Sequence, residues 1–233
     1  MIEAEWWEHD DAEAFAEAIA GDIGFIIESA LDARAAALLA LSGGKTPIKA
    51  YEKLAQMKLD WKKVTIFPVD DRLVKVDSPL SNVAMLARIF LPKGARVVPL
   101  GAENPDYKGA GNAADARLQD LPWPPDLVLL GVGSDGHTAS IFPGPDRDAA
   151  LTAPKTRRAI GVMPDPLPHE APVARVTMTR SAILSARALM LALTGDEKRA
   201  IVEQAIEDGA GSTVPIGQVL AEAEQPIDIH WTA

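Results

Sequence analysis

The sequence contains no cysteine, and this absence removes several kinds of chemistry at once. Disulfide bonds, thiolate nucleophiles and cysteine-ligated zinc sites are all excluded. A chain without cysteine fits a reducing compartment, and we expect a cytoplasmic location. The four histidines lack the short spacing of a helical metal site, so we expect no metal ion.

Positive charge is also scarce. The chain carries 23 Lys and Arg against 33 Asp and Glu, which gives a formal net charge of -10. A nucleic-acid-binding protein usually presents a basic surface, but the pairs Lys62-Lys63 and Arg157-Arg158 stand alone. We therefore expect no nucleic-acid partner. An anionic substrate would have to enter a locally positive pocket against the overall negative field.

Long apolar runs are missing too. The longest are far shorter than a membrane span, and the acidic start MIEAEWWEHDDAEAF lacks the apolar segment of a signal peptide. We therefore expect no membrane association. The 233 residues are 48% hydrophobic, which is enough for one sizeable core. The proline-rich stretches 122–125 and 164–172 do not separate two cores, and we expect residues 1–233 to form one domain.

Strand-like and helix-like segments alternate along the chain. Hydrophobic periodicity predicts helices at 11–31, 47–57, 80–91, 109–119 and 195–208. It predicts strands at 35–41, 63–69, 96–100, 126–132, 158–163, 173–178, 187–193 and 226–231, the last as an edge strand. The fully apolar segment 126–132 is typical of the centre of a parallel sheet. The pattern indicates an α/β fold, with a doubly wound, mostly parallel open sheet and helices on both faces.

The loop SGGKTP follows the strand at 35–41. Its Gly-Lys-Thr ending resembles an ATP-binding P-loop, but that motif needs a glycine where Leu39 stands. Two glycines and the free N–H groups of a following helix would still favour an anion. The alternative is an ordinary tight turn with Thr46 as the helix cap. The candidate anion ligands in this loop are Ser42, Gly43, Gly44, Lys45 and Thr46.

The segment GVGSDGHTASIFPGP, residues 131–145, contains a formal G-x-G-x-x-G pattern. A dinucleotide site is not expected, because Pro143 and Pro145 limit the following helix and the only acid near the required spacing is Asp165. The segment also contains Asp135-Gly136-His137. A histidine titrates near neutral pH and suits a general base, which a neighbouring carboxylate can orient. The alternative is a structural loop histidine.

Three further charged positions follow or begin predicted elements. Asp70-Asp71-Arg72 follows the strand 63–69, Arg175 begins a strand, and Lys198 lies in the first turn of the helix 195–208. Each could be an ordinary surface group. A lysine in a first helical turn opposes the helix dipole, and a bound phosphate would remove that conflict. Ligands of open α/β sheets bind beyond the carboxyl ends of the parallel strands. We therefore expect these segments to meet at that edge and to form a phosphate site beside a His/Asp/Arg cluster.

Six motifs together resemble the 6-phosphogluconolactonase family: SGGKTP, VDDR, SPLSN, GVGSDGHTASIFPG, RVTMT and GDEKRA, in this order. The resemblance covers about residues 10 to 220. Asp71 stands where the family usually has Glu, and Lys45 stands at a variable position. The resemblance implies hydrolysis of 6-phospho-D-glucono-1,5-lactone to 6-phospho-D-gluconate, the second step of the oxidative pentose phosphate pathway. It implies no metal or organic cofactor, and the sequence leaves monomer and homodimer open.

The resemblance also implies roles for the candidate residues. His137 would be the general base and Asp135 would orient it, although either Asp70 or Asp135 could be its closer partner. Arg72 would stabilise the oxyanion or bind sugar hydroxyls, with Asp70 helping to place it. The phosphate would lie against Gly43 and Gly44 with Arg175 and Lys198.

Glucosamine-6-phosphate deaminase is the main alternative, because it resembles this sequence in architecture and in the Asp-Gly-His loop. The deaminase pattern places a glutamate five residues after its histidine, where this chain has Phe142. A phenyl ring cannot relay a proton, which favours the lactonase. A third alternative is a sugar-phosphate-binding protein without catalysis. The intact Asp135 and His137, and the absence of an appended basic segment, argue against it.

Overall fold

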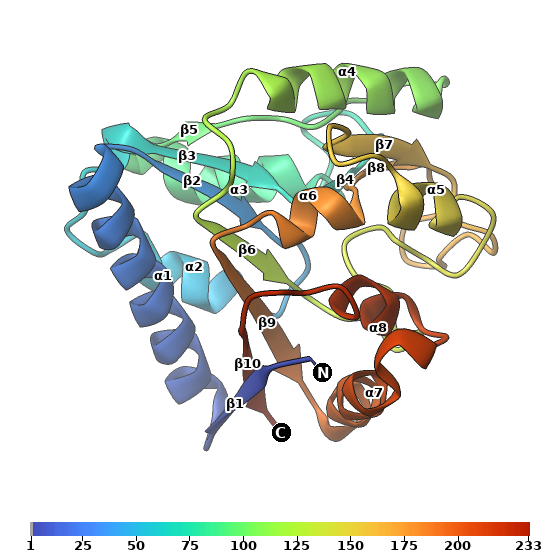
Figure 1. Ribbon diagram of the computed structural model, residues 1–233. Coiled ribbons are helices and arrows are strands. Elements are labelled where there is room, and N and C mark those ends of the chain that lie inside the picture. The colour runs from blue at the N-terminus through green and yellow to red at the C-terminus, as the bar shows by residue number, and fades with distance from the viewer. Residues whose placement is uncertain (1) are drawn as a thin grey trace.

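The computed structural model describes residues 2–233, and its largest element is a seven-stranded sheet (Figure 1). The strand order is β1-β10-β9-β6-β2-β3-β5, and every neighbouring pair is parallel. The strands are β1 (Ala4–His9), β2 (Ala37–Leu41), β3 (Val64–Pro68), β5 (Arg96–Val97), β6 (Leu127–Leu130), β9 (Ala188–Thr194) and β10 (Ile227–Thr232). The central strands β2 and β6 are buried at every position, as their continuous apolar sequences predict.

A second, three-stranded antiparallel sheet has the order β4-β8-β7. Its strands are β4 (Asp70–Arg72), β7 (Ala159–Val162) and β8 (Arg175–Met178). The chain passes directly from the large sheet into the small one. The Val69 N–H donates to the Leu41 carbonyl, and the Val69 carbonyl accepts from the Met178 N–H. This junction places β4 and β8 at the carboxyl end of β3.

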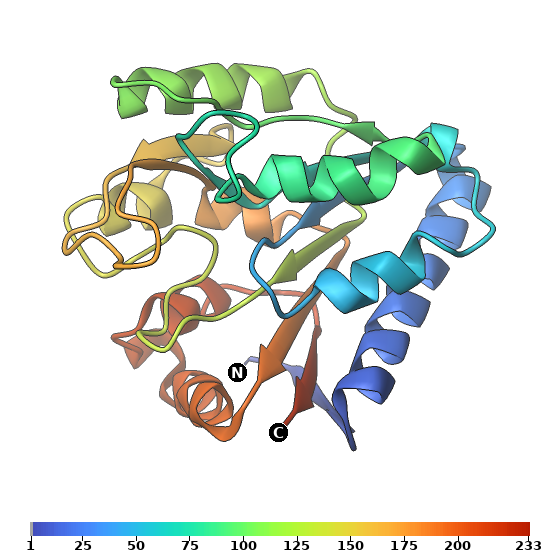
Figure 2. The same ribbon diagram turned by 180° about the vertical axis from the view of Figure 1, so that it is seen from behind.

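Two layers of helices cover the large sheet (Figures 1 and 2). The helices are α1 (Ala12–Arg34), α2 (Ile48–Leu54), α3 (Asn82–Phe90), α4 (Tyr107–Gln119), α5 (Arg147–Thr152), α6 (Arg180–Leu184), α7 (Asp196–Asp208) and α8 (Pro215–Leu220). Alternate side chains of the central strands enter different cores. Leu39 and Leu129 pack with α1, α2 and α3, whereas Leu38 and Val128 pack with α4, α6, α7 and α8. The doubly wound α/β architecture is confirmed.

Parts of the secondary-structure prediction were wrong. β10 was expected at an edge, but it lies between β9 and β1, and β1 is the edge strand. The sequence AEWWEH of β1 has no regular two-residue period, and its half-buried and exposed residues alternate only over the first four positions. Pro47 was expected as the first residue of α2 but precedes it as the cap residue. None of the helices within residues 2–233 has the length and apolar character needed to cross a bilayer.

The parallel order brings three loops to one edge of the sheet. β2, β6 and β9 are neighbours, so the segments that follow them begin at the same carboxyl edge. These segments are SGGKTP after β2, the glycine-rich loop after β6, and Gly195 with α7 after β9. The small sheet joins the same edge through β4. All the predicted site segments therefore converge there, as open α/β sheets favour.

Candidate active site

The glycine-rich loop after β6 presents a histidine bound to an aspartate. His137 Nδ1 lies 2.5 Å from Asp135 Oδ1, and the same oxygen accepts from the His137 backbone N–H at 3.1 Å. Burial acts to raise the pKa of Asp135, but the hydrogen bond and charge of His137 outweigh it and hold that pKa below the usual value. An ionised Asp135 accepts from Nδ1–H, which leaves Nε2 as the ring's free basic nitrogen.

Two glycines shape this loop around the histidine. A Cβ on Gly133 would come closer than 3.0 Å to the ring atoms Cε1 and Nδ1 of His137 and to Asp135 Oδ1. Gly136 has φ +74°, in the left-handed region that favours glycine. The Gly133 N–H donates to the His137 carbonyl at 2.9 Å and closes the turn. The loop therefore holds the imidazole against bare backbone at Gly133.

The end of the same loop is tied to the small sheet. Ser140 Oγ donates to Asp70 Oδ2 at 2.5 Å, and the Ser140 N–H donates to Thr177 Oγ1 at 3.1 Å. Asp70 and Thr177 are opposite each other in the pairing of β4 with β8. Ser140 thus fixes the histidine loop to the strands that carry both arginines of the site.

Those arginines are a facing pair. Arg72 ends β4 and Arg175 begins β8, and the two are directly opposite in the antiparallel register, which places them on one face. Within the described residues, neither buried Nε atom has a hydrogen-bond partner. Burial lowers the pKa of Arg175, an effect that Asp70 opposes and Arg72 reinforces. Two like charges held together with free N–H donors can bind an anion such as a phosphate or a developing oxyanion.

Asp70 reaches Arg72 through Asn82, the first residue of α3. Asn82 Oδ1 accepts from Arg72 Nη1 at 2.8 Å. Asn82 Nδ2 donates to the Asp70 carbonyl at 2.8 Å and to Asp70 Oδ1 at 3.3 Å. Asn82 ends the SPLSN motif, but its sequence position alone gave no sign that it contacts Asp70 and Arg72. Asp135, and not Asp70, is the hydrogen-bond partner of His137.

Asp71 faces α3 instead of the histidine. Its carboxylate accepts from the backbone N–H groups of Arg72, Asn82 and Val83 at 2.9, 2.7 and 3.0 Å. Burial raises the pKa of Asp71 to about 6, although these hydrogen bonds favour the ionised form. Asp71 therefore fixes the start of α3, and with it the amide of Asn82.

The SGGKTP loop adjoins this group at one glycine. A Cβ on Gly43 would overlap the Asn82 side-chain amide, so only glycine lets the loop approach so closely. Gly44 has φ +85°, and Gly44 and Lys45 are exposed. Buried Ser42 is held through its carbonyl, which accepts from Tyr51 Oη at 2.9 Å. Thr46 does not cap α2, because the cap residue is Pro47.

Lys198 lies in the first turn of α7, half-buried, after Gly195 with φ +87°. The next residue, Arg199, is held by Glu8 at 2.8 Å and lies 4.5 Å from the Trp231 ring centroid. Contacts link His137, Asp135, Asp70, Arg72, Arg175 and Gly43. Ser42, Gly44, Lys45 and Thr46 lie on a loop at the same sheet edge, and Lys198 lies there in the first turn of α7.

Comparisons with known proteins show the family to which this chain belongs. Residues 10–231 match the family model of glucosamine-6-phosphate isomerases/6-phosphogluconolactonase. A 6-phosphogluconolactonase of Mesorhizobium japonicum is 38% identical over 232 residues, covering 97% of this chain and 94% of that protein. The crystal structure of a 6-phosphogluconolactonase from Shewanella baltica is 33% identical, with a TM-score of 0.90 over 100% of both chains.

A more distant structure shares the fold alone. A monomeric glucosamine-6-phosphate deaminase is 19% identical, with a TM-score of 0.78 over 98% of this chain and 97% of its own. The match over residues 10–231 and the identity to the Mesorhizobium japonicum protein decide the assignment. The chain belongs to the family of glucosamine-6-phosphate isomerases and 6-phosphogluconolactonases.

Proposed function

We propose that this chain hydrolyses 6-phospho-D-glucono-1,5-lactone to 6-phospho-D-gluconate, the second step of the oxidative pentose phosphate pathway. The observation that carries the proposal is the His137–Asp135 pair at 2.5 Å in a loop tied to two facing arginines. A base beside an anion-binding group is what hydrolysis of an anionic lactone requires. The full-length similarity to 6-phosphogluconolactonases supports the same substrate.

The proposed reaction begins with water. His137 Nε2 takes a proton from the water as its oxygen bonds to the lactone carbonyl carbon, and the carbonyl oxygen becomes an oxyanion. Asp135 stabilises the imidazolium that forms, through the hydrogen bond at Nδ1. The tetrahedral intermediate collapses by breaking the bond between this carbon and the ring oxygen. The imidazolium returns the proton to that oxygen, so one water is consumed and His137 is regenerated.

The arginines have separate tasks in this proposal. Arg72, held by Asn82 and through it by Asp70, donates to the oxyanion or to sugar hydroxyls. Arg175 and Lys198 bind the phosphate. The loop residues Ser42, Gly43, Gly44, Lys45 and Thr46 complete the phosphate site with backbone N–H and side-chain donors. Phosphate binding is remote from the reacting carbon and serves to position the lactone ring.

Deaminase activity is the second candidate, and Phe142 argues against it. The Phe142 ring lies stacked on the His137 imidazole, with ring centroids 4.1 Å apart. A hydrocarbon face therefore occupies the position at which the deaminase pattern has a carboxylate. The intact His137–Asp135 pair in turn favours an enzyme over a binding protein without catalysis.

A coupled assay tests the proposal. Glucose 6-phosphate dehydrogenase generates the lactone in place, and 6-phosphogluconate dehydrogenase reports its hydrolysis as NADPH. We expect the chain to accelerate hydrolysis far above the spontaneous rate. Ammonia release from glucosamine 6-phosphate, with no effect on the lactone, would instead establish the deaminase. If neither assay shows turnover while the chain still binds sugar phosphates, the chain is a sugar-phosphate-binding protein without catalysis.

A further inference from the structure

Phe142 contacts both the base and the guanidinium proposed to bind phosphate. Its ring stacks on His137 with a centroid separation of 4.1 Å and an interplanar angle of 24°. The Arg175 guanidinium carbon lies 5.0 Å from the same ring centroid, within the range of a cation–π contact. Phe142 is only 8% exposed. One buried ring therefore connects the histidine loop to β8.

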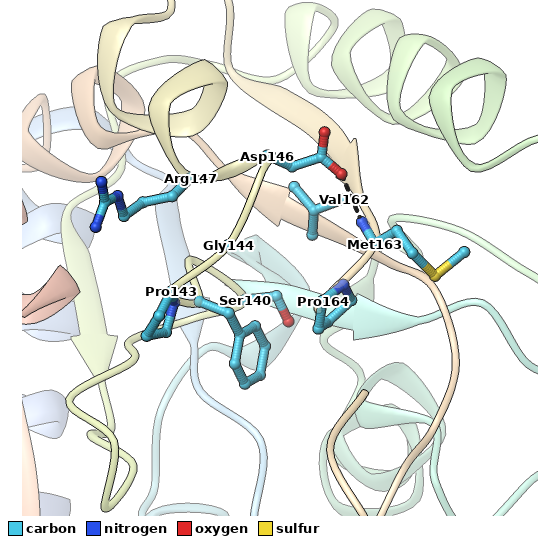
Figure 3. A pocket seen from close by; sticks show the side chains of 9 residues that line it. Ser140, Pro143, Gly144, Asp146, Arg147, Val162, Met163 and Pro164 are labelled. Atoms are coloured by element: carbon cyan, nitrogen blue, oxygen red, sulfur yellow. Dashed lines mark hydrogen bonds between the residues drawn. The ribbon is translucent and has the colours of Figure 1, made fainter. Parts of the chain in front are cut away.

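The surroundings leave this ring little freedom. Ile141, the preceding residue, is fully buried, and Ser140 is fixed by Asp70 and Thr177. Phe142 lines a cavity of only about 10 Å³, which is room for about one water molecule. Pro143 and Pro164 line the same cavity (Figure 3). Across this cavity, Asp146 Oδ2 accepts from the Met163 N–H at 2.8 Å. Phe142 is therefore a buried ring in a loop segment whose neighbouring residues are fixed on its N-terminal side.

We propose that Phe142 is a positioning residue, which sets the orientations of His137 and Arg175 relative to each other. This inference rests on the proposed hydrolase function. The face of an aromatic ring is electronegative and attracts cations. Arg175 is a permanent cation, and His137 becomes one when it takes a proton from water. A flat, negatively polarised surface holds both groups in a way that an aliphatic side chain of similar size cannot.

Two substitutions at Phe142 distinguish the effect of the aromatic ring from the effect of an apolar side chain. Phe142→Leu removes the π face and keeps an apolar side chain, whereas Phe142→Tyr keeps the ring. We expect Phe142→Leu to lower kcat about tenfold, equivalent to about 1.4 kcal/mol, and to raise KM severalfold. Phe142→Tyr is expected to stay near wild type. Loss of folded protein alone would lower the apparent kcat without raising KM.

The matched control is Phe90→Leu. Phe90 is fully buried and packs on Tyr51 and Trp61 in the core covered by α1, α2 and α3. It belongs to no part of the proposed site. The same change there should leave kcat and KM of the folded protein within twofold of wild type. The Arg175→Met substitution removes the cation that contacts the Phe142 ring. In a protein that already carries Arg175→Met, the further substitution Phe142→Leu should therefore raise KM only slightly.

Proton NMR gives a readout that does not depend on activity. The aromatic ring current should shift the His137 ring protons upfield in wild type and in Phe142→Tyr, and Phe142→Leu should abolish that shift. The inference is overturned if wild type hydrolyses the lactone while Phe142→Leu keeps its kcat and KM, or if the His137 resonances do not respond. An inactive wild type would refute the proposed function instead, and the resonances would still report the stacking.

Discussion

A single methyl group at Gly133 should disable the base. The Gly133→Ala substitution places a Cβ closer than 3.0 Å to His137 Cε1 and Nδ1, a separation that real Cβ atoms essentially never show. The φ of Gly133 lies outside the left-handed region, so alanine can adopt the backbone. The loop backbone is held by the hydrogen bond from the Gly133 N–H to the His137 carbonyl at 2.9 Å. The imidazole and the Asp135 carboxylate bound to it are therefore the parts that move.

The size of the effect follows from the displacement. Ordinary carbon contacts lie at about 3.5–4.0 Å, so the ring must move by roughly 1.5 Å. A misplacement of about 1 Å can cost roughly 100-fold in rate, or about 2.7 kcal/mol of transition-state stabilisation. Stability should change by less than about 1 kcal/mol. The lost Asp135 contact is partly offset by the smaller entropy of an unfolded chain with alanine.

Gly131→Ala is the matched control in the same loop. A Cβ there would have no atom within 4 Å. Coupled-assay kinetics and urea unfolding should show a large fall in kcat for Gly133→Ala, little change in KM, and wild-type behaviour for Gly131→Ala. The reasoning is refuted if Gly133→Ala keeps wild-type kcat, because the base would then tolerate displacement. Equal loss in both variants would point to the loop backbone instead.

Three further predictions concern charge and hydrogen bonding around the site. Asp71 has its folded pKa raised to about 6, above an unfolded value of about 3.9, so its stabilising contribution is greatest below pH 4 and is lost as pH rises through 6. Urea unfolding of wild type and Asp71→Asn should be compared at pH 4 and pH 7.5. The free energy of unfolding of wild type, relative to that of Asp71→Asn, should fall by about 3 kcal/mol over this range. A difference between the two proteins that does not change with pH would contradict the raised pKa. Lys198→Ala should raise KM roughly tenfold and leave kcat within about threefold in steady-state assays, whereas exposed Lys62→Ala should change neither. Asn82→Ala removes the link between Asp70 and Arg72 and should lower kcat/KM at least about tenfold, and wild-type kinetics would exclude that link from the reaction.

The large sheet could be predicted from the sequence because its central strands carry a strong local signal. The apolar segments 126–132 and 187–193 became β6 and β9, which are neighbours in the middle of the sheet. Parallel pairing then places the loops that follow at one edge. The edge strand β1 was missed because its sequence AEWWEH carries no regular two-residue period. The small sheet was also missed, since antiparallel pairing of β4 with β8 joins residues a hundred positions apart.

The candidate site divides in the same way. His137 and Asp135 are two residues apart, so the sequence offered Asp135 as a partner, but it left Asp70 open as well; the structure selects Asp135. Asn82 and Phe142 contact distant segments, and hydrophobic periodicity carries no signal for such contacts. The acidic pair at 70–71 was ambiguous for a related reason. Neighbouring residues of a strand point to opposite faces, so Asp70 meets Ser140 while Asp71 meets α3.

The most direct test of the proposed chemistry is kcat for lactone hydrolysis by His137→Ala, measured beside wild type in the coupled assay at matched folded concentration. General bases contribute about 10²–10⁴-fold to rate. We predict a fall in kcat within that range, with KM changed by less than about threefold, because the phosphate ligands remain in place. A variant that retains near-wild-type kcat would show that His137 is not the base.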